Sequence, residues 1–421
     1  MKKIVLSLAS VLVATAFAPE ASAIPSFARQ QGKACSTCHF QHYPALNDYG
    51  RSFKAGGFVD MGKQGTLKGD NLSLPEVLNS SIFFKFRYQD TNGSDLAGTG
   101  NSTLASGEWQ IADEFALLMG GRVSENVGFM FEGQLLDPTA GVLAGFKMPA
   151  MWGVGEGELK IGVVPFSTDA LGAAYGFELL NTGAVRNVRI SEHRAETSAQ
   201  QYIGTAQGAQ GLAFVVADPM FFVNVTRYAP DSATDAKMNL TYLRVAATPT
   251  FGEWDVAFGV QSWTGSGSEH NGTATDLQYK AFSIDAQAQG AVAGMPLGLY
   301  FANTSAPAGS GTEFNLFNCT TTAGACTGHN PNSKKATTIL AELGVVPGTA
   351  TVQLGYRKAD TGAATDSKDD AITVGATYNY TQNIQLQVMH STRSKAGNVG
   401  RYAGSQEKGS ALTTFMLSAG L

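Results

Sequence analysis

The clearest fold signal in the chain runs from Ile82 to Tyr88, which reads Ile-Phe-Phe-Lys-Phe-Arg-Tyr. The even-numbered positions of this stretch are apolar, while Lys85 and Arg87 alternate with them. Successive side chains of a strand point to opposite faces, so this period of two predicts a strand with one apolar and one polar face.

The same alternation recurs along the chain to its last residues. Mean hydropathy is near zero, and after residue 23 no apolar run reaches the ~18 residues expected of a membrane helix. Transmembrane barrel strands give this profile because lipid-facing and lumen-facing positions alternate over about ten residues. One segment has a break, since Asp113 stands on an otherwise apolar face. The apolar positions of four such segments are Trp109, Ile111, Phe115, Leu117 and Met119; Val352, Leu354 and Tyr356; Ile384, Leu386 and Val388; and Phe415, Leu417, Ala419 and Leu421.

Short and long connections mostly alternate between these segments, as they do in outer-membrane barrels. Seven short turns predict sixteen antiparallel strands, the first near 81–89 and the last near 409–421. The other connections are then extracellular; the largest is 167–207, and 136–141 is the one short exception. A soluble β-sandwich or solenoid is the alternative, but the chain has no fixed repeat, and the asymmetry disfavours a sandwich. The predicted turns are at 122–126, 152–156, 217–220, 249–252, 293–296, 347–348 and 380–383.

A second signal lies near the N-terminus, where Cys35-Ser36-Thr37-Cys38-His39 has the form of a c-type haem attachment sequence. Cys35 and Cys38 would each form a thioether to the haem, and His39 would ligate its iron. A thioredoxin-like redox pair or half of a zinc site are the competing interpretations. A redox pair needs no following histidine, and a zinc site needs a second ligand pair that does not follow at suitable spacing.

The first 23 residues have the pattern of a secretory signal peptide. Lys2 and Lys3 precede an apolar run over 4–18, and Ala-Ser-Ala at 21–23 matches a cleavage site, so we expect the mature chain to start at Ile24. Export agrees with covalent haem, which is attached outside the cytoplasm. The formal net charge of −5, without a basic patch, argues against a nucleic-acid partner.

We expect residues 24–61 to form a small helical monohaem cytochrome unit, 62–79 a linker and 80–421 the barrel. Helices are predicted at 33–42 and 45–54. A core of about 40 residues is too small to be stable alone, so haem and a larger surface must complete it. Side chains expected to cover the porphyrin are Phe27, Tyr43, Leu46, Tyr49 and Phe53.

The sequence does not determine the second axial ligand of the haem iron. Met61 is a candidate through its thioether, but packing at the end of the unit explains it equally well. His42 is placed to bond a haem propionate. His193 is a further histidine that would reach inward only if its connection folds into the lumen.

Cys319 and Cys326 enclose six residues in a predicted external connection. In an oxidising compartment a disulfide is the natural interpretation. A metal site with His329 is the minor alternative.

The N-terminal residues carry a resemblance to a known family. Residues 25–30 read PSFARQ, 35–47 read CSTCHFQHYPALN, 50–54 read GRSFK and 56–58 read GGF. Together they resemble the fused outer-membrane monohaem cytochrome–porins, which include ferrous-iron-oxidising cytochromes. The resemblance implies one haem c, an outer-membrane porin-like barrel and extracellular Fe(II) as electron donor.

Two functions follow from these observations. The first is electron transfer from extracellular Fe(II) through the haem to a soluble periplasmic carrier, an oxidoreductase acting on metal ions if the chain is classed as an enzyme. The second is a diffusion porin with a structural or sensory haem unit. For iron contact, Asp95, Glu192 and Glu196 are candidates by location only.

Because a membrane band of about 25 Å separates the outside from a periplasmic haem, we expect the unit to lie inside the barrel. Lumen-facing residues expected to hold it are Lys85, Arg87, Glu114, Gln385 and Gln387.

Overall fold

The computed structural model describes residues 25–70, 72–91, 107–135, 143–169, 171–183, 198–230, 237–270, 273–310, 313–322, 325–393 and 411–421. The expected signal peptide lies outside the described residues, as do Asp95, Glu192, His193 and Glu196. No helix in the described part of the chain is long and apolar enough to span a membrane.

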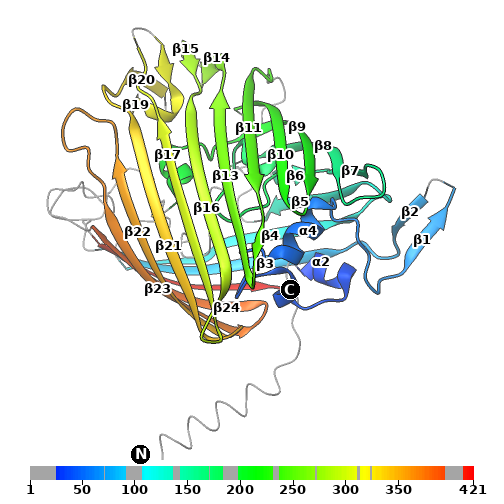
Figure 1. Cartoon of the computed structure of the whole chain (residues 1–421). Coiled ribbons are helices and arrows are strands. Elements are labelled where there is room, and N and C mark those ends of the chain that lie inside the picture. The colour runs from blue at the N-terminus through cyan, green and yellow to red at the C-terminus, as the bar shows by residue number, and fades with distance from the viewer. Residues whose placement is uncertain are drawn as a thin grey trace, which may run out of the picture.

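Sixteen antiparallel strands close into one barrel, which confirms the predicted fold and strand count (Figure 1). Two of these strands are interrupted: β6 and β7 both pair with β8, and β11 and β12 both pair with β13. The last strand pairs with the first and closes the ring. The strands are β3 (Ser80–Thr91), β4 (Glu108–Arg122), β5 (Gly128–Gln134), β6 (Leu143–Lys147) with β7 (Ala150–Gly153), β8 (Lys160–Thr168), β9 (Ala209–Asp218), β10 (Phe221–Ala229), β11 (Leu240–Ala247) with β12 (Thr250–Phe251), β13 (Trp254–Thr264), β16 (Ala281–Val292), β17 (Met295–Ala306), β21 (Lys334–Val346), β22 (Ala350–Asp360), β23 (Ala371–Thr381), β24 (Ile384–Arg393) and β25 (Ala411–Gly420).

Burial along the strands follows the predicted period of two. Leu354 and Phe415 are 57% and 51% exposed on the outer surface, whereas Gln353 and Thr414 beside them are buried in the lumen. A closed barrel leaves no unpaired strand edge, and an apolar outer surface has lipid as its matching solvent. The chain is therefore an outer-membrane barrel, as the sequence predicts.

The break at Asp113 has a structural cause. The register between β3 and β4 shifts after the pair Lys85–Glu114, so that Phe86 pairs with Ile111. This bulge turns Asp113 inward, where its carboxylate forms an ion pair with Arg87 at 2.8 Å. Ile111 keeps the outward orientation that the alternation predicts and is 74% exposed.

The seven predicted short turns all join consecutive strands, and they lie at the same end of the barrel. Short turns face the periplasm in outer-membrane barrels, which gives the orientation. At the other end, β14 (Ser266–His270), β15 (Thr273–Gln278) and β18 (Phe314–Asn315) form a small sheet. The pair β19 (Cys319–Thr322) and β20 (Ala325–His329) lies beside it at the upper end of Figure 1.

The structure joins Cys319 to Cys326 by a disulfide across β19 and β20. Replacing both with serine is expected to speed protease cleavage of the 307–333 connection roughly several-fold, because the disulfide no longer restrains the loop. Reduction of bound haem by Fe(II) is expected to stay unchanged. A large loss of Fe(II) reactivity would instead point to a metal site that includes His329.

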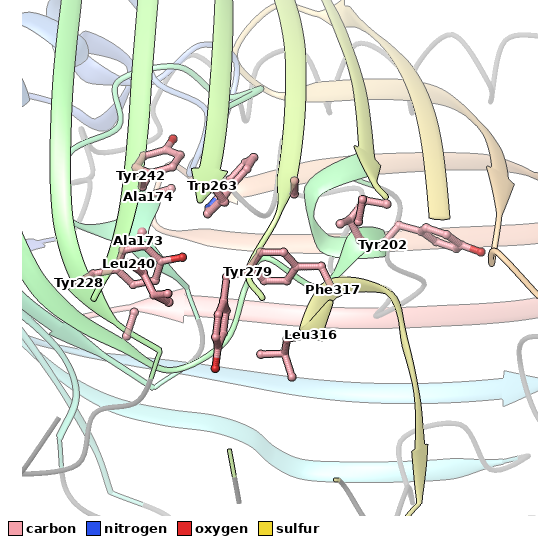
Figure 2. Packing of buried hydrophobic residues seen from close by; sticks show 14 of the residues in the cluster. Ala173, Ala174, Tyr202, Tyr228, Leu240, Tyr242, Trp263, Tyr279, Leu316 and Phe317 are labelled. Carbon is pink, nitrogen blue, oxygen red and sulfur yellow. The ribbon is translucent and has the colours of Figure 1, made fainter. Parts of the chain in front are cut away.

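The outer half of the lumen is packed by inward-folded parts of the long connections. The longest connection contributes η2 (Ala173–Tyr175) and α5 (Ala199–Ile203), and η4 (Leu316–Asn318) comes from another. Figure 2 shows their side chains beside aromatic residues of the wall, among them Tyr242 and Trp263, whose ring centroids are 5.0 Å apart. These segments therefore obstruct a lumen that sixteen strands would otherwise leave open.

The N-terminal unit differs in detail from the prediction. Its helices are α2 (Pro25–Gln31), α3 (Cys35–Cys38) and α4 (Asp48–Ala55). The helix predicted over 33–42 is wrong beyond one turn, because Ala34 before it and His39 after it both have extended backbone conformations. The expected linker 62–79 also contains a hairpin of β1 (Thr66–Gly69) and β2 (Leu72–Pro75), which Arg122 holds to the barrel through Ser73. Leu72-Ser73-Leu74 alternates in polarity, but three residues are too few to predict a strand.

Candidate functional site

A cavity of about 620 Å³ lies between the N-terminal unit, the wall formed by β3, β4, β5 and β6, and the inward-folded segment 171–178. Its volume falls within the ~300–1,000 Å³ typical of ligand sites. At the turn end it is bounded by Asn383 and Gly420, and at the other end it reaches Asp169 and Leu171, which follow the last residue of β8. One cavity therefore extends from the periplasmic mouth to the start of the longest outer connection.

The attachment sequence borders this cavity. Cys35 and Cys38 form one helical turn, which puts their side chains on the same side of α3. Cys38 and His39 line the cavity, while Cys35 is buried against Ala28. Cys35 and Cys38 are not joined by a disulfide.

His39 has the geometry of a proximal ligand. Its Nδ1 lies 3.2 Å from the carbonyl oxygen of Ala45, and donation of that proton leaves Nε2 as the lone-pair donor. Burial lowers the pKa of His39 to about 4, so the ring is neutral at pH 7 and able to bind a metal.

The two thiols do not have the properties of a redox pair. Burial raises the pKa of Cys35 to about 12 and also raises that of Cys38. Thioredoxin-like cysteines have lowered pKa values, because the thiolate is the reactive species. This difference disfavours the redox-pair alternative.

Most of the aromatic side chains expected to cover a porphyrin do line the cavity. Phe27 stacks on Phe58 with ring centroids 4.8 Å apart and meets Phe53 edge-on at 5.4 Å. Tyr49 is the exception, because its hydroxyl bonds Gln31 instead. The expected residues that line the cavity are Phe27, Tyr43, Leu46 and Phe53.

The second axial ligand is not identified by position. Met61 is half-buried and is not among the residues that line the cavity. Met130 of β5 does line it and is a second thioether, which the sequence analysis missed because it sits at an ordinary lumen-facing position.

Charged side chains of both signs complete the cavity lining. The carboxylates are Asp113, Glu114, Glu132, Asp169 and Glu178, and the lysines are Lys33, Lys54, Lys85 and Lys147. Lys54 comes from α4 and Lys147 from β6, and the ammonium group of Lys147 donates to the carbonyl of Tyr175 at 2.8 Å. Burial lowers the pKa of Lys54. The size of the cavity, its aromatic lining, a neutral histidine beside two thiols and two lysines suited to propionates together fit a covalently bound haem.

The unit is held by lumen-facing side chains from several sides of the barrel. His42 bonds Glu342 of β21, and both side chains are fully buried, so His42 serves as an anchor to the wall rather than as the expected propionate partner. Arg51 pairs with Asp255 of β13 at 2.6 Å, and Tyr43 bonds Ser418 of β25 at 2.8 Å. These contacts place the unit inside the barrel near its turn end, as expected.

The lumen-facing residues expected to hold the unit divide into three groups. Gln385 donates to the carbonyl of Tyr43 at 3.4 Å, a direct contact. Lys85 and Glu114 pair with each other and line the cavity. Arg87 and Gln387 instead bond wall residues, namely Asp113 and Thr377.

The alternative metal sites gain no support. Among the described residues, no group of three or more His, Cys, Asp or Glu side chains is arranged to hold a metal ion. Asp95, Glu192 and Glu196, the candidates for Fe(II) contact, lie outside the described residues.

No family model matches the chain, and no curated protein matches it. Similar solved structures include Salmonella typhi OmpF in complex with daunomycin, at 11% identity and TM-score 0.48, covering 85% of this chain and 100% of that one. Another is the outer-membrane channel DcaP of Acinetobacter baumannii, at 10% identity and TM-score 0.45, covering 82% and 97%. The outer-membrane protein OpdK of Pseudomonas aeruginosa is also similar, at 10% identity and TM-score 0.41, covering 81% of this chain and 98% of that one. Such distant likenesses carry no argument here, and the barrel rests on its own strand pairing.

Proposed function

We propose that the chain is an outer-membrane electron-transfer protein, with one haem c on Cys35 and Cys38, ligated by His39, inside the barrel. When bound, the haem supplies one-electron redox chemistry between extracellular Fe(II), which loses the electron, and a soluble periplasmic carrier, which gains it. Fe(III) then forms outside, where its precipitation does not foul the periplasm.

The supporting observation is the extent of the cavity. It holds His39 of the attachment sequence and reaches from Asn383 at the periplasmic turns to Asp169 at the outer end of β8. A haem in this cavity would lie among the barrel strands rather than beneath them, which would shorten the distance to an outer donor. The N-terminal unit lies at the turn end, where a periplasmic carrier has access.

The chain's own residues have separate parts in this function. His39, with its Nδ1 directed to Ala45, would offer the lone pair of Nε2 to the iron. Phe27, Phe53 and Phe58 line the cavity and would keep water from a haem bound there. The ion pair of Arg51 with Asp255 and the contact of His42 with Glu342 hold the unit against the wall.

A diffusion porin is the second candidate. Sixteen strands are the number that leaves an aqueous channel in porins, which favours it. The packing of the lumen by η2, α5 and the N-terminal unit weighs against rapid passage of solutes.

Stopped-flow mixing of the purified holoprotein with Fe(II) tests the proposal, with solute flux through reconstituted barrels measured in parallel. We expect rapid appearance of the reduced haem spectrum and negligible flux. Haem that Fe(II) does not reduce, in a barrel that passes solutes freely, would establish the porin instead.

A further inference from the structure

The longest outer connection contacts the backbone of the N-terminal unit directly. The Leu46 amide donates to Oδ1 of Asn181 at 2.9 Å, and Nδ2 of Asn181 donates to the Leu46 carbonyl at 3.1 Å. Asn181 is only 6% exposed and belongs to the inward-folded segment 171–183. Its amide group therefore satisfies both backbone groups of one residue at a site with little access to water.

Leu46 is in turn the neighbour of the haem ligand. A β-bridge pairs it with His39, and the Asn47 amide donates to the Cys38 carbonyl at 3.0 Å. Ala45, the residue before Leu46, accepts the bond from His39 Nδ1. Residues 45–47 thus fix both the backbone and the ring of His39.

The wall fixes Asn181 itself. The backbone N–H of Asn181 donates to Oε1 of Gln287 at 2.9 Å, and the hydroxyl of Thr182 donates to Asp285 at 2.7 Å. Gln289, on the same strand β16, also reaches the Leu46 carbonyl at 3.2 Å. A continuous set of hydrogen bonds leads from β16 through Asn181 and Leu46 to His39.

We propose that Asn181 is a positioning residue for His39, through which the outer connection sets the orientation of the haem ligand. This inference rests on the proposed function, because it requires haem on the attachment sequence. Groups that bond a metal's ligands orient those ligands and tune the metal's potential. Loss of the Asn181 side chain removes the acceptor of the Leu46 amide and leaves the Leu46 carbonyl with Gln289 alone. We expect residues 45–47 to shift, because a buried amide without an acceptor is costly.

The test is Asn181→Leu in the full-length holoprotein. We expect a changed low-temperature EPR and Soret signature of the haem. At a fixed applied potential, the ratio of reduced to oxidised haem is expected to change about tenfold, the scale of one buried hydrogen bond. Asn181→Ala, which leaves room for water, should give a smaller change in the same direction and covers the case in which the leucine variant does not assemble.

The matched control is Asn318→Leu. Asn318 is also buried and donates to two backbone carbonyls, those of Ala306 at the end of β17 and Asn332 in another outer connection, away from the N-terminal unit. Its replacement is expected to leave the haem signature unchanged. A wild-type signature in the Asn181 variants, or an equal change in Asn318→Leu, would overturn the positioning role. Wild-type protein without bound haem would overturn the proposed function as well, so the two failures are distinguishable.

Discussion

Replacing both Cys35 and Cys38 with alanine is expected to abolish covalent haem and, with it, reaction with Fe(II). The barrel should still assemble, because its strand pairing involves neither residue. Haem staining on a denaturing gel measures attachment, and heat-modifiable migration measures the barrel. The matched control is the pair Cys319→Ser and Cys326→Ser, which removes two cysteines and should keep the stain. Retained staining after the Cys35 and Cys38 replacements would refute the attachment site.

Replacing Arg244 with methionine is expected to release the inward-folded connection from the wall. The Arg244 guanidinium is fully buried between two carboxylates, with its Nη1 2.6 Å from Asp285 and its Nε 2.9 Å from Glu178. Removing it leaves both carboxylates without their cation, and breaking a buried pair in this way costs about 3–5 kcal/mol. We expect a large gain in protease cleavage within 171–207 and a larger solute flux through the barrel.

Arg227→Met is the control for this variant. Arg227 lies on β10, beside β11, but is exposed on the outer surface, where it bonds Thr241 and the Met238 carbonyl. The same chemical change there should leave protease resistance and flux unaffected. Equal effects of the two replacements would show that Arg244 has no special role in closing the lumen.

The barrel could be predicted from the sequence because its signals are local. The alternation at Ile82–Tyr88 and the short turns depend only on neighbouring residues, and the structure has the same strands and turns. The Asp113 break was visible, but its cause depends on register with β3 and on Arg87. The alternation of apolar and polar residues predicts neither the register shift nor the ion pair.

The site was predictable only in part. Cys35, Cys38 and His39 form a local motif, which borders the cavity described above. Asn181 and Glu342 contact the unit across more than a hundred residues of sequence. No periodicity marks Asn181, and Glu342 reads as one more lumen-facing position. Charged residues are rare in this chain, and a carboxylate buried in the lumen needs a polar partner there. Glu342 could therefore have been predicted to contact something inside the barrel.

The central claim is that the haem lies inside the barrel, within electron-transfer distance of an outer donor and of a periplasmic acceptor. The most direct measurement uses holoprotein inserted in vesicles with its long connections outward, the haem oxidised and Fe(II) added only to the external solution. We predict prompt growth of the reduced haem spectrum, with no Fe(II) entering the vesicle. Reduction that occurs only when the reductant is placed inside, on the side of the short turns, would contradict the account.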